Sequence, residues 1–154
     1  MAVEKLGERL PIELYKLSNA MMRGAQNMLS SQCEKFGIES EGFSYINGWI
    51  MYYLYNHQEE DIFQRDIEQE FSITRSSASK IIRLMEKKSF LSAESVPEDA
   101  RLKKLTYKQQ EKPYRLVMKQ SMSSLEERML RGFSQDELRQ LTAFIKRMQE
   151  NLKA

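Results

Sequence analysis

Short hydroxyl side chains flanked by cations, between Ser72 and Met85, are the part of this chain best suited to hold another molecule. Serine adds little bulk and both donates and accepts hydrogen bonds, whereas arginine and lysine reach guanine edges or phosphates. The residues concerned are Arg75, Ser76, Ser77, Ser79, Lys80 and Arg83. Their chemistry is hydrogen bonding and charge pairing with a nucleic acid. The alternative is an ordinary solvated helix face, and this stretch alone does not distinguish the two.

The same stretch has the apolar spacing of a packed helix. Ala78, Ile81, Ile82 and Met85 recur at i, i+3, i+4 and i+7, and Thr74 offers a side-chain oxygen that can cap the helix start. The spacing predicts that the apolar side faces a core and the hydroxyl and cationic side faces outward.

Charge is unevenly distributed along the chain. Residues 74–108 hold nine Lys or Arg against four Asp or Glu, a net charge of +5. Because the whole chain carries only +2, the remaining residues carry −3. A local basic field on a nearly neutral protein is typical of a surface that binds a polyanion, although chance clustering in a lysine-rich protein gives the same balance.

Composition indicates one mostly helical domain. The chain has 154 residues, with only 3 Pro and 6 Gly, and its charged residues make up 30%. The first residues lack the apolar run of a signal peptide, and the longest apolar run, Trp49 to Tyr55, is too short to span a membrane. We therefore expect a cytoplasmic protein that binds no membrane. The single cysteine, Cys33, agrees with a reducing compartment.

Two closely spaced short helices are predicted in the middle of the chain. The predicted helices run from Pro11 to about Phe36, from Glu41 to His57, from Ile62 to Phe71 and onward from Thr74. Gly37 is expected to stop the first of them. Because only Ser72 and Ile73 separate the last two, they are predicted to form a helix-turn-helix.

A β-hairpin, or wing, is predicted from Leu91 to Tyr107. The turn is expected at Pro97 to Ala100, followed by a return strand from Arg101 to Tyr107. Lys103 and Lys104 make this strand cationic, so it would extend the phosphate-facing surface of the preceding helix.

The C-terminal third returns to helix. Ser134 and Glu137 form a capping box, with Phe133 and Leu138 at the two staple positions. Apolar residues at alternating steps of three and four then predict a seam between helices. The seam and its partner at the N-terminus comprise Leu14, Leu17, Leu138, Leu141, Ile145, Met148 and Leu152. These seams exceed what one small lobe needs, which favours a homodimer; an intramolecular three-helix bundle is the alternative.

The order of elements and four motifs resemble the MarR family of bacterial transcriptional regulators. The motifs are Asp61-Ile-Phe-Gln-Arg-Asp-Ile-Glu, Ile73-Thr-Arg-Ser-Ser-Ala-Ser, Leu84-Met-Glu-Lys-Lys and Asp99-Ala-Arg. Two positions depart from that family: Ser89 stands where a Gly commonly leads into the wing, and Lys108 where a Thr usually caps the next helix. Because Pro113 also lies near the start of the helix that follows the wing, that helix is expected to begin irregularly or to kink.

The resemblance implies a mainly α winged helix-turn-helix with a small β-hairpin wing. It implies an obligate homodimer, with residues 1–37 and 108–154 as the helical dimerisation region and 38–107 as the DNA-binding region. The recognition helix would enter the major groove of double-stranded DNA, and Asp99 and Arg101 would form the wing tip. Asp99 could orient the Arg101 guanidinium through a bidentate pair. The function implied is a repressor on a pseudo-palindromic operator.

A small aromatic or anionic effector is also implied by the resemblance. Aromatic residues of the second helix, together with Tyr15, could line a pocket between the two lobes, although Trp49 and Tyr53 fit a core equally well. The aromatic residues of that helix segment are Phe43, Tyr45, Trp49, Tyr52, Tyr53 and Tyr55.

Other function classes have weaker support. One His, one Cys and no Gly-rich phosphate loop argue against an enzyme, and no cofactor is expected. His57 with the acids at 59–61 could bind a metal, but a solvated loop is the simpler interpretation. Two alternatives stay open: a thiol-based redox sensor acting through Cys33, and a helical dimerisation module that binds no DNA.

Overall fold

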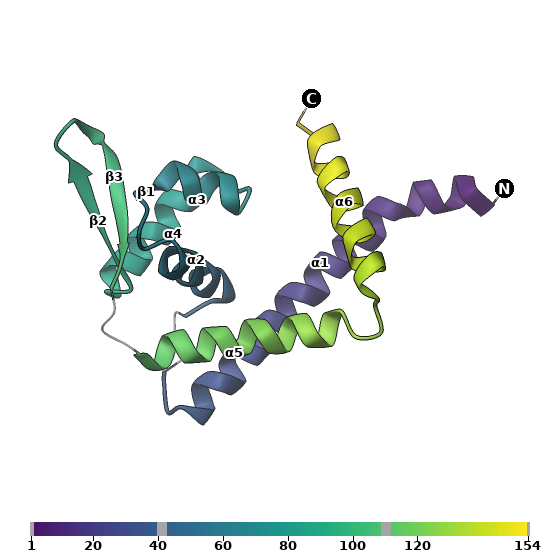
Figure 1. Cartoon of the computed structure of the whole chain (residues 1–154), viewed down its shortest axis with the longest axis horizontal. Coiled ribbons are helices and arrows are strands. Elements are labelled where there is room, and N and C mark those ends of the chain that lie inside the picture. The colour runs from purple at the N-terminus through teal and green to yellow at the C-terminus, as the bar shows by residue number, and fades with distance from the viewer. Residues whose placement is uncertain (1, 40–42, 109–111, 154) are drawn as a thin grey trace.

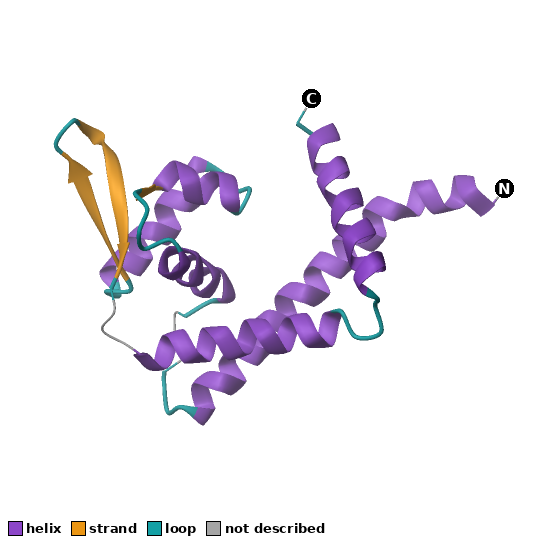
Figure 2. Cartoon of the chain, viewed as in Figure 1, coloured by secondary structure: helices purple, strands orange, loops and turns teal. Residues whose placement is uncertain are grey.

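The computed structural model describes residues 2–39, 43–108 and 112–153, and within them six helices and three strands (Figure 1). The helices are α1 (Ala2–Lys35), α2 (Tyr45–Asn56), α3 (Gln64–Glu70), α4 (Arg75–Lys87), α5 (Lys112–Met129) and α6 (Gln135–Asn151). The strands are β1 (Ile62–Phe63), β2 (Leu91–Val96) and β3 (Asp99–Tyr107). Figure 2 shows this predominance of helix, with one β-hairpin at the edge of the molecule. The predicted fold class, mainly α with a wing, is confirmed.

The wing is a three-stranded antiparallel sheet rather than a simple hairpin. Its strand order is β1-β3-β2, and Ile62 of β1 pairs with Leu105 of β3. The sequence prediction missed β1, because a two-residue strand has no detectable period. The predicted turn was also too long: only Pro97 and Glu98 form it, and Asp99 already belongs to β3.

The helix-turn-helix is confirmed, with a later start for its first helix. Ile62 and Phe63 are extended, and α3 begins at Gln64 because the Asp66 carboxylate accepts a 2.7 Å hydrogen bond from the Phe63 N–H. An acid in this position satisfies a free main-chain donor and opposes the positive end of the helix. The predicted start at Ile62 was therefore wrong by the length of β1.

The first two helices also differ from the prediction at their starts. Helix α1 begins at Ala2 and passes through Pro11, which cannot donate to the carbonyl oxygen four residues earlier. Helix α2 begins only at Tyr45, after an extended Ser44; the expected first residue, Glu41, lies outside the described residues. The predicted stop of α1 is confirmed at Gly37, whose φ is +64°.

Helices α1 and α5 lie side by side and complete a core shared with the winged region (Figure 1). Leu29 and Cys33 of α1 are buried there with Val117 and Met118 of α5. The other buried members are Phe43, Ile50, Met51, Leu54, Ile62, Ile67, Ile82, Met85, Phe90, Leu91 and Leu105. Helix α5 begins at Lys112, so Pro113 occupies its first turn, where no main-chain donor is required.

The far ends of the chain contribute little to this core. No residue of α6 is buried, and every residue from Gly7 to Ser18 of α1 is exposed. The capping box of α6 is confirmed, because the Ser134 hydroxyl accepts from the Glu137 N–H and the Glu137 carboxylate accepts from the Ser134 N–H. Leu152, predicted in the seam, lies beyond the end of α6 and is 86% exposed.

Two serines adopt left-handed backbone conformations on either side of α4. Ser72 has φ +50° and Ser89 has φ +62°. Ser89 ends α4 in a Schellman motif, in which the Phe90 N–H donates to the Met85 carbonyl at 2.9 Å and the Ser89 N–H donates to the Glu86 carbonyl at 2.9 Å. Glycine is preferred in this conformation because it has no Cβ. Glycine, which the resemblance leads us to expect at position 89, would adopt this conformation without that strain.

We expect Ser89→Gly to stabilise the fold. Relief of the left-handed strain should raise the free energy of unfolding by about 0.5 to 1 kcal/mol, the net of strain relief and the greater freedom of an unfolded glycine. Urea denaturation followed by circular dichroism measures the change. Ser92→Gly, the same substitution in the extended strand β2, is the matched control and should destabilise the protein. Equal effects of the two substitutions would show that Ser89 is not strained.

Candidate nucleic-acid interface

An open groove runs between α4 and the wing, and it gathers most of the predicted DNA-binding residues. Helix α4 supplies Arg75, Ser79 and Arg83 to its lining, and β3 supplies Asp99, Arg101 and Lys103. These residues come from two elements that are separated in sequence but joined by the packing of α4 against β2. The hydroxyl and cationic face of α4 and the cationic strand therefore form one surface.

The outward orientation of this face follows from the packing of the opposite face. Ala78 and Met85 are fully buried, and Ile82 is almost so, whereas Ile81 is only partly buried. Thr74 caps the helix, because its hydroxyl oxygen accepts a 3.2 Å hydrogen bond from the Ser77 N–H. The predicted two-faced helix and its cap are both confirmed.

Four predicted residues lie outside the groove lining. Ser76, Ser77 and Lys80 are exposed elsewhere on α4. Ser77 accepts a 3.0 Å hydrogen bond from the Thr74 hydroxyl, so its side chain takes part in the cap. The fourth, Lys104, forms a 2.6 Å ion pair with the carboxylate of Asp61, before β1.

The wing tip differs from the predicted geometry. The carboxylate of Asp99 accepts a 2.9 Å hydrogen bond from the main-chain N–H of Arg101, not from its guanidinium as predicted. A main-chain bond two residues apart is the ordinary way in which aspartate stabilises a turn. None of the ion pairs between described residues includes Arg75, Arg83 or Arg101. Their charges are thus available to a ligand.

Arg65 of α3 is a groove residue that the sequence reasoning missed. It lines the groove beside α4, and its guanidinium carbon lies 5.5 Å from the ring centre of Phe63. Such cation–π contact holds a guanidinium in place without neutralising its charge. Arg65 lies within the motif that begins at Asp61, so the motif contained the residue but gave no indication that it faces α4.

Besides Asp99, two acids reduce the positive charge of the groove. Glu68 and Glu86 also line it. The Glu68 carboxylate accepts a 3.0 Å hydrogen bond from the Gln64 amide, which also lies 3.4 Å from the main-chain oxygen of Arg75. These contacts join α3 to the first residue of α4 and help to fix where the recognition helix begins.

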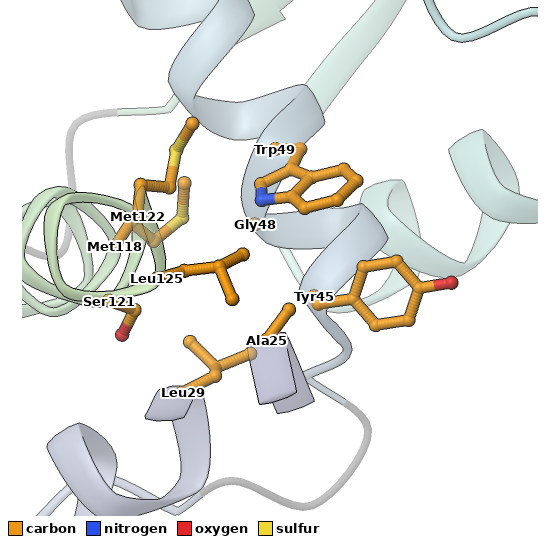
Figure 3. A pocket seen from close by; sticks show the side chains of 9 residues that line it. All are labelled: Ala25, Leu29, Tyr45, Gly48, Trp49, Met118, Ser121, Met122 and Leu125. Carbon is orange, nitrogen blue, oxygen red and sulfur yellow. The ribbon is translucent and has the colours of Figure 1, made fainter. Parts of the chain in front are cut away.

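A small cavity lies between α1, α2 and α5 (Figure 3). Its volume is about 20 Å³, and Leu125 of α5 extends toward its middle. Tyr45 and Trp49 line it, with ring centres 5.1 Å apart, as two of the predicted pocket aromatics. The remaining lining residues are Ala25, Leu29, Gly48, Met118, Ser121 and Met122. Of the other predicted aromatics, Phe43 is in the core and Tyr15 is 69% exposed on α1.

The geometry does not favour the redox or metal alternatives. Cys33 is completely buried, and burial raises the pKa of its thiol, which disfavours the reactive thiolate. The His57 ring packs against the Tyr53 ring, with ring centres 4.1 Å apart, and the His57 Nδ1 lies 2.7 Å from the Tyr53 carbonyl oxygen. Among the described residues, no three His, Cys, Asp or Glu side chains are close enough to share a metal ion.

No helix in the described part of the chain is long and apolar enough to cross a membrane.

Comparison with known proteins agrees with this geometry. A sequence model of the MarR family matches residues 41–102. A search of curated proteins found no match. Among solved structures, the transcription regulator MarR from Oenococcus oeni PSU-1 is 26% identical, covers 94% of this chain and 98% of its own, and has a TM-score of 0.66.

Two further solved structures share the fold at lower identity. The S. aureus MepR–DNA complex is 22% identical over 92% of this chain and 96% of its own, with a TM-score of 0.71. The heme sensor protein PefR from Streptococcus agalactiae, in complex with heme, is 23% identical over 94% and 91%, with a TM-score of 0.56. These likenesses support the winged helix-turn-helix fold across nearly the whole chain.

Adjacent lysines of β3 should differ in their effect on affinity for duplex DNA. Lys103 lines the groove, whereas Lys104 is neutralised by Asp61, so we expect Lys103→Ala to weaken binding several-fold. Loss of one phosphate contact should also reduce the slope of log affinity against log salt by about 1. Lys104→Ala is the matched control and should leave that slope nearly unchanged. Fluorescence anisotropy across a salt series measures both, and equal slopes for the two variants would contradict the assignment.

Proposed function

We propose, from the premise that residues 41–102 belong to the MarR family, that this chain is a sequence-specific regulator of transcription that binds double-stranded DNA. The observation that carries the proposal is the groove in which α4 and β3 place Arg75, Arg83 and Arg101 together, outside any ion pair between described residues. The chain would bind DNA without catalysing a reaction. It would act in the cytoplasm, where bacterial DNA lies.

Helix α4 would supply the direct contacts to base edges in the major groove of DNA. Small serines, Ser76 and Ser79, permit close approach, and Arg75 and Arg83 can reach guanine or phosphate. The wing would place Arg101 in the neighbouring minor groove, where the potential is most negative. Arg65 and Lys103 would add backbone contacts that fix orientation but read no sequence.

We further propose that the chain acts as a homodimer on a pseudo-palindromic site. Exposed apolar side chains along the first half of α1 and along α6 support a second copy of the chain as their partner. Exposure of apolar surface to water is unfavourable in a monomer, and a second copy would bury it. They include Leu10, Ile12, Leu14, Leu17, Leu141, Phe144 and Ile145. Residues 1–37 and 108–154 would then be the dimerisation region, and 38–107 the DNA-binding region.

A ligand could release the DNA if it bound better to one arrangement of the two recognition helices. The cavity of Figure 3 has a volume of only about 20 Å³, but it lies where α5 meets α1 and α2, so a ligand that enlarged it would change how these helices pack. Its lining contains two aromatic rings and no cation, which favours an apolar or aromatic compound over an anionic one. The regulator would then be a repressor.

Selection of genomic fragments tests the proposal directly. The purified chain should retain a small set of fragments that share an inverted repeat. Arg75→Ala, Arg83→Ala and Arg101→Ala should each weaken binding to the selected fragment by about 10-fold or more, as loss of a specific base or minor-groove contact requires. Circular dichroism should show that the variants stay folded. No enrichment of any fragment, or unchanged affinity for all three variants, would contradict the proposal.

Oligomeric state tests the dimerisation region separately. We expect Ile145→Glu to shift the chain from dimer toward monomer, because a charge cannot be buried unpaired within an apolar interface. Ala143→Glu is the control, since residue 143 lies on the opposite side of α6 and is also exposed. Sedimentation velocity at matched concentrations distinguishes the two. A wild-type chain that sediments as a monomer would refute the dimer.

A further inference from the structure

Contacts among Arg115, Tyr55 and Tyr107 join α5, α2 and the end of β3. Arg115 of α5 donates a 2.7 Å hydrogen bond from its guanidinium to the hydroxyl oxygen of Tyr55 on α2. Its guanidinium carbon also lies 4.8 Å from the centre of the Tyr55 ring. Tyr55 in turn meets Tyr107, at the end of β3, with ring centres 5.8 Å apart and nearly perpendicular. A chain of contacts therefore runs from α5 through α2 to the wing.

The chemistry of this cluster suits a fixed, directional link. A hydrogen bond from a charged donor is shorter and stronger than one between neutral groups, although Arg115 is exposed and water competes for the Tyr55 hydroxyl. The perpendicular arrangement of Tyr55 and Tyr107 is a favourable geometry for two rings. Burial raises the pKa of the Tyr107 phenol, while the charge of Arg115 opposes that rise. Burial thus favours the neutral phenol, which suits an apolar packing surface.

Apolar contacts also join α5 to the winged region. A side chain at Gly48 of α2 would lie about 3.4 Å from the Met118 sulfur, so the two helices approach closely there. Phe43 and Phe90 both pack against Tyr114 of α5, with ring centres 5.0 and 5.3 Å away. Apolar burial is non-directional, so these surfaces allow small rotations that a hydrogen bond does not.

We propose that Arg115 is a positioning residue, which acts through Tyr55 to fix the angle between α5 and the winged region, and hence the placement of α4 on DNA. The inference rests on the proposed function, because only a chain that binds DNA through α4 makes use of that angle. Arg115 acts at the junction, and its guanidinium is engaged by Tyr55 rather than by the groove between α4 and the wing.

Spin-label distances across the junction provide a measurement that does not depend on DNA. Labels at Lys87 of α4 and Glu126 of α5, both exposed, would be introduced as cysteines in a Cys33→Ala background. Mixing with an excess of unlabelled chain leaves at most one labelled copy in each dimer, so that only distances within one copy are measured. We expect Tyr55→Phe, which keeps the ring and the Arg115 charge, to broaden the distance distribution. Arg115→Met should broaden it further, and Lys119→Met, an exposed charge on the same helix, should not.

DNA affinity of the same variants completes the test. If the junction sets a binding-competent angle, Tyr55→Phe and Arg115→Met should weaken binding to the selected fragment by about 3- to 10-fold, and Lys119→Met by much less. Distances unchanged in both variants, or broadened without loss of affinity, would overturn the proposal. So would weaker binding with an unchanged distance. If the wild type binds no DNA, the proposed function fails, and the distances alone support or overturn the role of Arg115 at the junction.

Discussion

The burial of one side of α4 determines how the rest of this molecule can be used. Ala78, Ile82 and Met85 are buried, and their removal from water is the main favourable term that holds the helix in place. Because an α-helix turns through 3.6 residues, anchoring this stripe also fixes where the other side points. Arg75, Ser79 and Arg83 thus face the groove as a geometric consequence of apolar packing. The site needs no additional device to orient its recognition helix.

Much of this could be predicted from the sequence, because the relevant patterns are local. The cap at Thr74, the stripe of α4, the capping box at Ser134 and the stop at Gly37 each depend on residues within about two turns of one another. All of them are present in the structure. The basic surface could be predicted for the same reason, because nearly all its cations lie within residues 74–108.

The features that escaped prediction depend on contacts distant in sequence. Strand β1 exists because β3 pairs with it, and Ile62 alone gives no sign of that pairing. Lys104 looks equivalent to Lys103 until Asp61 is brought to it from the other side of the helix-turn-helix. Helix α1 begins at Ala2, nine residues before Pro11, although local rules place its start at Pro11. The exposed apolar residues of α1 agree with a partner that contacts them. For β1 and Lys104, a tertiary contact decides what the local pattern leaves open.

The distribution of charge within the groove has a consequence for selectivity. Nonspecific binding to DNA grows with the number of phosphates that a protein neutralises, and it is the same for every sequence. Glu68 and Glu86 place negative charge among the arginines, and Asp61 removes Lys104 from the available cations. Both effects weaken attraction to arbitrary DNA while leaving the hydrogen bonds of α4 unchanged. Since specificity is the ratio of the two affinities, acids in a DNA-binding groove can increase discrimination even though they lower affinity. The modest net charge of +2 is therefore compatible with a protein that must find one site among many.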